Sequence, residues 1–456
     1  MKSKNYLQCL AGFAVLQFGS SCAAVCYVNG NATGKNDGSS WVNAFVHPQF
    51  ALLTGCKEIW VAKGVYTPAG KGSDPTFSFD ISPGTKMYGG FAGDESSVDQ
   101  RLPSINQTVL SGDVDHNDTD TGDWMNRTPS NIKGRNSYHV VTMQPSTAVP
   151  ITSDTVLDGF LVVGGFAAFG ADSHEGGGFY CSSDDDATCS PVLSNLAFVG
   201  NGTGGDGGAI AFSNIIATPT ITNSVFHNNF SFGGGGAIFI DSTDSVGSTL
   251  ISGCTFTNNG ADYDGGAIEA ANVQLDIVNT TFFENLSDAG QGGAIDLFSN
   301  APLAIKNATF AGNFAAKEGG AISNLQSGSL GSIVITNSIF WSNSTSLGSA
   351  ADIYEPAPNF AFVASSVLEH DCPDALSVCL SVSTIDPKLS SPADHGGSTI
   401  TLLPGAGGSA IDTGDDGSAC PPFDQRGVAR PQGAHCDIGA VEWQPSDDII
   451  FRNGFQ

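Results

Sequence analysis

The sequence predicts an all-β fold, a parallel β-helix, and two observations lead to this prediction. A short motif returns six times between residues 193 and 353, at intervals of 26 to 30 residues, and a fixed period of this length marks stacked repeats. Within the copies, apolar residues stand two apart, as in Ile210/Phe212, Ile238/Ile240 and Ile295/Leu297. Period two is typical of strands with one buried face, and the block leaves no room for helices of ordinary length.

Each copy of the motif combines a phenylalanine, two flanking asparagine positions and a glycine corner. The phenylalanine is followed three residues later by asparagine in Phe198/Asn201, Phe226/Asn229, Phe256/Asn259, Phe282/Asn285, Phe310/Asn313 and Phe340/Asn343. Five corners read Gly-Gly-Ala-Ile and end at Ile210, Ile238, Ile268, Ile295 and Ile322, and the sixth keeps Gly348 and Ile353. Three residues before the phenylalanines stand Asn195, Asn223, Gly253, Asn279, Asn307 and Asn337. We expect both sets of asparagines to form amide ladders along the axis, at corners that suit positive φ.

The paired motifs Phe-x-x-Asn and Gly-Gly-Ala-Ile resemble the repeat of the polymorphic outer membrane protein family, which is implicated in bacterial adhesion. The resemblance covers residues 193–353, about a third of the chain. The resemblance implies a β-helix, a surface location and a role in adhesion. It does not imply that this chain is exported in the way that family is.

Two further stretches resemble parts of secreted bacterial proteins. Tyr88–Glu95, Arg101, Leu110–Asp113, Tyr138–Val141 and Leu157–Phe160 are similar to the N-terminal half of right-handed parallel β-helix proteins. Ser409–Gly414, Asp424–Gly427, Arg430–Pro431 and Asp437–Glu442 look like the C-terminal module called a choice-of-anchor Q domain. The first resemblance extends a right-handed solenoid of the pectate-lyase type back to about residue 57.

We therefore expect five segments. They are a signal peptide (1–24), an N-terminal cap (25–56), the β-helix (57–393), a C-terminal cap of choice-of-anchor Q type (394–443) and a tail (444–456). Lys2 and Lys4 precede an apolar stretch that is too short to span a bilayer, and cleavage after Ala24 fits the small residues there. Acylation of Cys22 is the alternative. The mature chain is expected to be secreted, or on the outer surface of a bacterium, without a transmembrane segment.

Cysteine spacing predicts disulfides. Of the 11 cysteines, Cys9 and Cys22 precede the expected cleavage site, so nine remain. Eight form the plausible pairs Cys26/Cys56, Cys181/Cys189, Cys372/Cys379 and Cys420/Cys436. Exported proteins commonly use such disulfides, whereas the spacing and the lack of nearby histidines speak against zinc. Cys254 is left over, at a repeat position that small residues hold elsewhere, and we expect a buried thiol.

The acidic composition makes nucleic acid a poor partner. Lys and Arg number 17 against 45 Asp and Glu, a net charge of −28, and phosphate binding needs a basic patch. The acidity suits solubility or divalent cations, and calcium is the one possible cofactor. Its first candidate site is the loop 113–123, which offers Asp113, Asp115, Asn117, Asp118, Asp120 and Asp123 at near-alternate positions. An EF-hand would need glycine where Asp118 stands, so a solvated loop is the alternative.

A second acidic group lies in the repeats, where Asp264, Glu269 and Asp296 are low-ranking candidates for catalysis. Glu269 and Asp296 occupy one position in adjacent coils and are expected about 5 Å apart, the separation found in retaining glycosidases. Like charges so close raise one pKa, as an acid catalyst requires. The alternatives are side chains that splay into water or share a cation.

Other enzymatic sites are hard to assemble from the sequence. Parallel β-helices include pectate lyases and polygalacturonases, so the fold leaves enzymatic activity open. Lyase chemistry needs a basic residue beside the calcium ligands, yet only Lys306 and Lys317 lie in the repeat block. Farther on, Arg426 and Arg430 stand near Asp424, Asp437 and Glu442. We interpret this group as paired charges that lock a cap.

These observations favour an exported, non-catalytic β-helix that acts in adhesion or extracellular interaction. Polysaccharides or cell-surface ligands are its candidate partners. The alternatives are a polysaccharide lyase or glycoside hydrolase of the same fold and a structural component of a surface layer.

Overall fold

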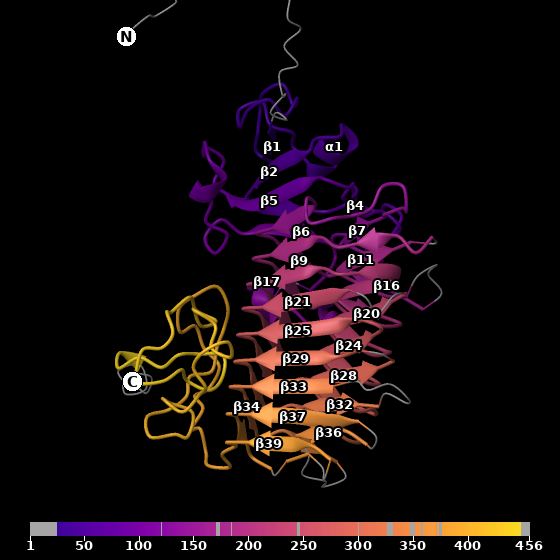
Figure 1. Cartoon of the computed structure of the whole chain (residues 1–456). Helices are drawn as coiled ribbons and strands as arrows, with labels where there is room; N and C mark the ends of the chain where they lie inside the picture. The colour runs from indigo at the N-terminus through magenta and orange to yellow at the C-terminus, as the bar shows by residue number, and fades with distance from the viewer. Residues whose placement is uncertain are drawn as a thin grey trace, which may run out of the picture.

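The computed structural model describes residues 25–447, except 120, 170–173, 184, 244–246, 300, 326–331, 347–351, 357–358, 371 and 374–375. The expected signal peptide, with its alternative at Cys22, and residues 448–456 of the expected tail lie outside this range. The described chain winds into an elongated parallel β-solenoid, with the N-terminal residues at one end of the stack (Figure 1). Every pair of neighbouring strands in its ladders is parallel, so the predicted fold class is confirmed.

Four parallel sheets run along the stack. The 12-stranded sheet contains β1 (Cys26–Val28), β2 (Glu58–Ala62), β5 (Lys86–Phe91), β8 (Val156–Asp158), β13 (Val192–Ser194), β17 (Thr220–Thr222), β21 (Ser248–Ser252), β25 (Gln274–Val278), β29 (Leu303–Lys306), β33 (Ser332–Thr336), β37 (Phe360–Ala364) and β39 (Val378–Leu380). A second sheet, here called the phenylalanine sheet, contains β3 (Gly64–Tyr66), β6 (Thr108–Ser111), β9 (Leu161–Val163), β14 (Ala197–Val199), β18 (Val225–His227), β22 (Thr255–Thr257), β26 (Thr281–Phe283), β30 (Thr309–Ala311), β34 (Ile339–Trp341) and β38 (Val367–Leu368).

The other two sheets flank the glycine corners. The seven-stranded sheet contains β10 (Phe166–Ala167), β15 (Gly202–Thr203), β19 (Phe230–Ser231), β23 (Gly260–Ala261), β27 (Leu286–Ser287), β31 (Phe314–Ala315) and β35 (Ser344–Thr345). The sheet after the corners, here called the glycine-corner sheet, contains β4 (Phe79–Asp80), β7 (Val141–Met143), β11 (Phe179–Ser182), β16 (Ile210–Ala217), β20 (Ile238–Ser242), β24 (Ile268–Ala271), β28 (Ile295–Phe298), β32 (Ile322–Asn324) and β36 (Ile353–Tyr354), with β12 (Thr188–Cys189) paired to β16.

The few helices are short and lie near the N-terminal end. Helix α1 (Pro48–Leu53) packs against β1 and β4, and its Ala51 belongs to the hydrophobic core. Three single-turn 3-10 helices follow, η1 (Val98–Gln100), η2 (Trp124–Asn126) and η3 (Pro129–Asn131). No helix in the described part of the chain is both long and apolar enough to cross a membrane.

Rows of identical residues run through the core. The six motif phenylalanines are fully buried, and their rings stack almost parallel, with centroids 4.5 to 5.3 Å apart. The strand register places each ring directly on the equivalent one in the next turn, as Phe226 on Phe256. The corner isoleucines form a second buried row in the same way. Strand spacing therefore sets the ring spacing, since parallel strands lie about 4.8 Å apart.

The asparagine three residues after each phenylalanine forms a continuous amide ladder. Asn229 shows the pattern: its backbone N–H and its Nδ2 both donate to Asn259 Oδ1, at 3.1 and 3.0 Å. The same Nδ2 also donates to the carbonyl of Phe198 in the preceding turn. The pattern repeats from Asn201 to Asn343, and all six side chains are buried. This predicted ladder is confirmed.

The asparagines three residues before the phenylalanines behave differently. Each has a positive φ of 47° to 51°, as expected for the corner. Asn279, Asn307 and Asn337 do not bond one another, however. Their Nδ2 atoms donate to the carbonyl oxygens of Phe423, Asp437 and Asp415. The prediction of a second ladder was wrong, because these side chains point outward to another segment of the chain.

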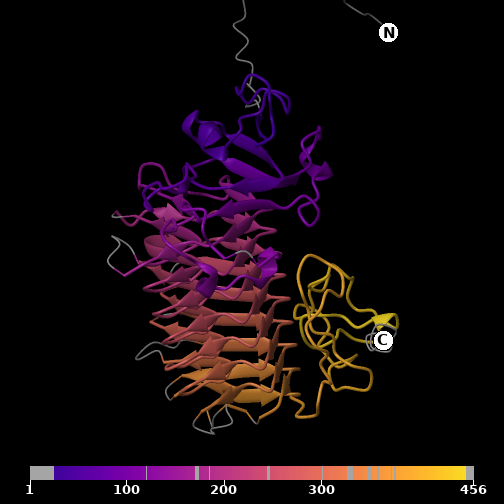
Figure 2. The same ribbon diagram turned by 180° about the vertical axis from the view of Figure 1, so that it is seen from behind.

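That segment, residues 394–447, lies along the flank of the stack rather than on its last turn (Figures 1 and 2). It covers the outward threonines of the phenylalanine sheet: Thr281 Oγ1 donates to Gln425 Oε1, and the backbone N–H of Ala440 donates to Thr309 Oγ1. Gln425 Nε2 also donates to the carbonyl of Cys254. The segment expected as a C-terminal cap thus contacts several turns at their sides.

All four predicted disulfides form, namely Cys26–Cys56, Cys181–Cys189, Cys372–Cys379 and Cys420–Cys436. The first ties β1 to the residues after α1, at the N-terminal end of the core. Cys254 is free and buried, as expected, and burial raises the pKa of its thiol to about 12. A thiol with such a pKa is inert at neutral pH.

The amide ladder leads to a first prediction. Asn259→Ala removes one rung and leaves the backbone and side-chain donors of Asn229 without their buried acceptor. We expect the free energy of unfolding to fall by roughly 1–3 kcal/mol for each unsatisfied group, measured by urea denaturation. Asn31→Ala, at an exposed turn position, is the control and should change little. Equal stability of the Asn259 variant and the parent would refute the ladder's contribution.

The corner asparagines lead to a second prediction. Asn307→Ala removes hydrogen bonds to the carbonyls of Asp437 and Gly439, so it should loosen residues 394–447. Limited proteolysis should cut this segment several-fold faster than in the parent, because cleavage follows the population of the opened form. Asn223→Ala is the matched control, since Asn223 has the same positive φ but an exposed side chain. Equal cleavage of both variants would contradict the prediction.

Candidate metal centre

The glycine corner places acidic side chains on the outside of the solenoid. Asp264 directly precedes the corner, and Glu269 is the second residue of β24. Ile268 and Ala270 point into the core, so Glu269 points outward. In the register of β24 with β28, Glu269 lies opposite Asp296 of the next turn. The sequence prediction that these two carboxylates occupy equivalent positions in adjacent coils is confirmed.

The three carboxylates converge. One ligand oxygen each from Asp264, Glu269 and Asp296 lies within 4.8 Å of the others. Glycines of the neighbouring turns make this possible, because a β-carbon at Gly234 would overlap Glu269 Oε2 and one at Gly290 would overlap Asp264 Oδ1. Asp264 is held in place by the backbone N–H of Gln291, which donates to its Oδ1 at 2.8 Å.

Asp296 is the most enclosed member of the group. The residue is only 3% exposed, and its Oδ1 has no hydrogen-bond partner. None of the ion pairs between described residues includes Asp264, Glu269 or Asp296. A buried carboxylate oxygen without a donor or a positive charge is costly, so this side chain calls for a further partner.

Burial and like charge raise the pKa values of the cluster. Burial, followed by the charges of Asp206, Asp296, Asp264 and Asp241, raises the pKa of Glu269 to about 9. Burial, followed by the charge of Asp264, raises the pKa of Asp296 to about 8. The cluster therefore holds protons at neutral pH unless a cation takes their place. Chemically it can bind a hard cation through oxygen atoms or store protons, and Asp296 is too enclosed in this conformation to touch a polymer.

The loop 113–123, the other predicted calcium site, is arranged differently. Its carboxylates accept hydrogen bonds from the protein: Asp118 pairs with Arg127 at 3.0 Å, Asp115 pairs with Arg135 at 3.1 Å, and Asp123 caps η2 through the N–H of Met125. Asp113 accepts from the backbone N–H groups of Asn117 and Asp118, and Asp120 lies outside the described residues. The described carboxylates thus bind donors within the loop and its neighbours, and calcium at this loop stays a prediction.

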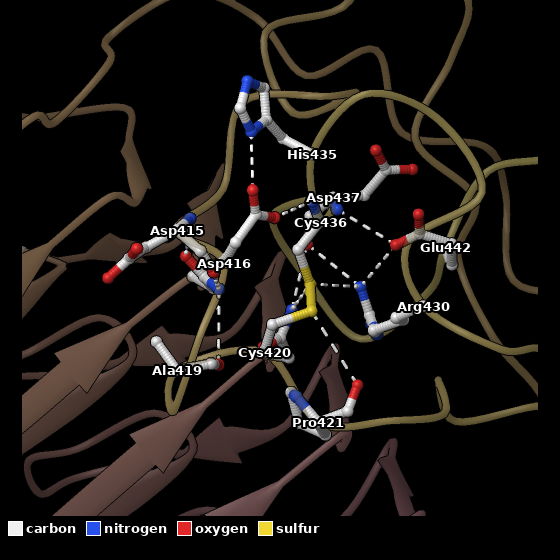
Figure 3. The surroundings of a disulfide bond; sticks show 12 residues. Asp415, Asp416, Ala419, Cys420, Pro421, Arg430, His435, Cys436, Asp437 and Glu442 are labelled. Carbon is white, nitrogen blue, oxygen red and sulfur yellow. Dashed lines mark hydrogen bonds and ion pairs between the residues drawn. A yellow bond between two sulfur atoms is a disulfide. The ribbon is translucent and has the colours of Figure 1, made fainter.

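The charged group near the C-terminus is an ion-pair network. Arg430 and Glu442 pair at 2.9 Å with both side chains buried, next to the disulfide Cys420–Cys436 (Figure 3). Glu442 Oε2 also accepts a hydrogen bond from the backbone N–H of Asp437. Burial raises the pKa of the Asp437 carboxyl to about 7. Arg426 pairs with Asp424 at 3.1 Å and with Asp447 at 3.3 Å. Each guanidinium is thus matched by carboxylates, which fits the interpretation of charges that lock the segment.

The outer face of the seven-stranded sheet carries an apolar row that the sequence analysis missed. The register aligns Phe166, Gly202, Phe230, Gly260, Leu286 and Phe314 on successive strands. The rings lie over the glycines of the next turn, since a β-carbon at Gly202 would come within 2.9 Å of Phe166 Cδ2. Phenylalanine and glycine alternate over the first four of these positions, and that alternation was the available signal.

More exposed aromatic side chains extend this row. Phe169 is 69% exposed and Phe232 39%, and their ring centroids lie 5.4 Å apart. Tyr263, in the turn after β23, is 59% exposed, whereas Phe239 in β20 is buried. We call Phe166, Phe169, Phe230 and Phe232 the aromatic face.

Comparisons with known proteins support the repeat. The family model described as the Chlamydia polymorphic membrane protein repeat matches residues 253–271 and 307–325, which confirms the resemblance for these two stretches. No curated protein matches the chain. A solved structure described as the pectate lyase Pel9A aligns with a TM-score of 0.44 at 13% identity, over 92% of this chain and 96% of that one. So distant a structural likeness adds nothing on function.

The raised pKa values lead to a third prediction. With chelator present, Glu269 and Asp296 stay protonated in the folded protein up to about pH 8 to 9. In the unfolded chain the same groups lose their protons above about pH 4.5. The folded state therefore binds more protons between these limits, and the free energy of unfolding falls as pH rises from about 5 to about 9. Each proton accounts for at most about 1.4 kcal/mol per pH unit. Glu269→Gln with Asp296→Asn removes this contribution and should make the variant more stable than the parent at the alkaline end.

Urea denaturation between pH 5 and pH 9 measures the effect. Asp154→Asn is the control, because Asp154 is exposed and lies outside the repeats, and it should keep the parent's pH profile. Identical profiles for the double variant and the parent would show that these carboxylates titrate as they do in water.

Proposed function

We propose that this chain is an exported surface protein of a bacterium that acts in adhesion or extracellular interaction rather than in turnover of a substrate. Two findings support the location. Two stretches of the chain match the repeat of a family of bacterial membrane proteins. Four disulfides join the chain, as is usual in proteins that fold in oxidising compartments. The predicted signal peptide and segment boundaries belong to this proposal.

The observation that carries the interaction role is the aromatic face. Contiguous exposed apolar patches on a protein surface often mark interaction sites. Phe169 and Phe232 offer ring surface to solvent, and the Phe232 ring also contacts the half-buried Phe230. An extended polysaccharide is a suitable ligand, because sugar rings stack on aromatic faces and a regular sheet offers them repeated positions along one axis. The acidic surroundings favour a neutral or cationic glycan over an acidic one, because like charges repel.

The closeness of Glu269 and Asp296 is the observation that favours the alternative, a polysaccharide hydrolase or lyase. Retaining glycosidases hold two carboxyl groups about 5 Å apart, with both of them open to the substrate. Here Asp296 is almost fully enclosed, and its neighbours in the cluster are acidic. The non-catalytic role is therefore the better supported of the two.

A fourth prediction tests binding. Phe169→Ala with Phe232→Ala should weaken binding to the best ligand of an immobilised polysaccharide panel by about tenfold or more, because two exposed rings are lost. Phe77→Ala is the matched control, since Phe77 is 50% exposed near the N-terminal end and should bind like the parent. Binding by the parent that the double variant retains in full would exclude the aromatic face as the binding surface.

Turnover is measured on the same panel through released reducing ends and unsaturated products. We expect rates at the level of the blank. Cleavage well above the blank that is lost in Glu269→Gln with Asp296→Asn would replace the proposed role with the enzymatic one.

A further inference from the structure

We propose that Asp264, Glu269 and Asp296 bind one calcium ion on the outside of the solenoid, where it links two successive turns. The proposal concerns stability and goes beyond the proposed function, because it holds whether the protein binds a glycan or cleaves one.

The geometry fits a calcium ion. Oxygen ligands of calcium lie 2.3–2.6 Å from the ion, so two ligands of one ion are at most about 5 Å apart. The ligand oxygens of the three carboxylates all lie within 4.8 Å of one another, which satisfies this limit. Among the described residues, no other group of three acidic, histidine or cysteine side chains meets the same criterion.

The chemistry of the ligands selects the class of metal. All three are carboxylates, and neither histidine nor cysteine belongs to the group, so zinc and other metals that prefer nitrogen or sulfur are poor candidates. Magnesium usually keeps several waters and takes one or two carboxylates, whereas calcium accepts more protein oxygens in an irregular shell. Calcium therefore fits three carboxylates in a confined place better than magnesium does.

The burial of Asp296 is an independent reason to expect an ion. Its Oδ1 is enclosed and has no hydrogen-bond partner, and its strand places the side chain toward Glu269 of the preceding turn. Buried polar atoms are nearly always paired, so an unpaired one indicates a partner that the protein chain does not provide. A cation at this position would satisfy the oxygen and offset the negative charges of all three ligands.

The backbone around the group is shaped to admit the ligands. Glycine occupies the positions where a side chain would collide with the carboxylates of Glu269 and Asp264, at Gly234 and Gly290. The N–H of Gln291 fixes Asp264, and Asp206 accepts from the N–H of Gly234 at 2.7 Å in the turn above. Because Asp264 and Glu269 belong to one turn and Asp296 to the next, the ion would bridge turns through side chains alone.

The test compares thermal unfolding of the purified protein at pH 8 in chelator, in millimolar calcium chloride and in millimolar magnesium chloride. We expect calcium to raise the Tm of the parent by roughly 3–5 °C at a hundredfold excess over Kd, and magnesium to raise it less. Asp296→Asn should lose the calcium-dependent rise, and Asp154→Asn, an exposed control, should keep it. Calorimetric titration of the parent with calcium should give heat that Asp296→Asn lacks.

The following results would overturn the proposal. Equal Tm values of the parent in calcium and in chelator mean that no stabilising ion binds. A calcium-dependent rise that persists in Asp296→Asn places the ion elsewhere, for example at the loop 113–123. An equal rise with magnesium removes the assignment to calcium. Should Asp296→Asn fail to fold, Glu269→Gln takes its place in the same comparison. A failure here leaves the glycan-binding assay unaffected, since Phe169 and Phe232 are not among the proposed ligands.

Discussion

The stacking of equivalent residues in register is the constraint on which the rest of the structure depends. Parallel strands at a fixed spacing place every residue on its counterpart one turn away. A favourable contact between equivalent side chains is therefore repeated along the stack, and so is an unfavourable one. Stacked phenylalanine rings fill the interior, and buried asparagine amides satisfy the backbone where the chain turns. Because the amide carries both a donor and an acceptor, one residue type can bond upward and downward along the whole row.

The same constraint explains the two surface features outside the core. On the outer face of the seven-stranded sheet, Phe166 and Phe230 lie over Gly202 and Gly260, since a ring needs room over the next turn and glycine provides it. On the glycine-corner sheet, acids meet acids because Glu269 and Asp296 hold one position in the register. The parallel register thus gathers aromatic rings on one face and carboxylates on another. In both places the neighbouring groups come from successive turns of the chain.

Much of this was predictable because the repeat makes neighbours in space equivalent in sequence. The fold, the ladder from Asn201 to Asn343 and the pairing of Glu269 with Asp296 follow from the repeat spacing. The four disulfides lie outside the repeats and follow instead from the pairing of neighbouring cysteines in a chain expected to be exported. The burial of Asp296 did not follow, since the repeat spacing gives a residue's position in the register and not the exposure of its side chain. The partners of Asn279, Asn307 and Asn337 did not follow either, because residues 394–447 have no repeat and return to the stack from a distance in sequence.

The return of residues 394–447 along the flank affects how the solenoid resists unfolding under a mechanical force. A bare solenoid holds each turn only through its two neighbours, so it can peel from an end one turn at a time. Here the segment hydrogen-bonds to corners of three different turns, through Asn279, Asn307 and Asn337, and its own shape is fixed by buried ion pairs and a disulfide. A force along the solenoid axis must therefore break the hydrogen bonds between this segment and several turns at the same time. It cannot break them one turn after another. Such a lateral attachment replaces a gradual loss of turns with resistance up to a threshold force.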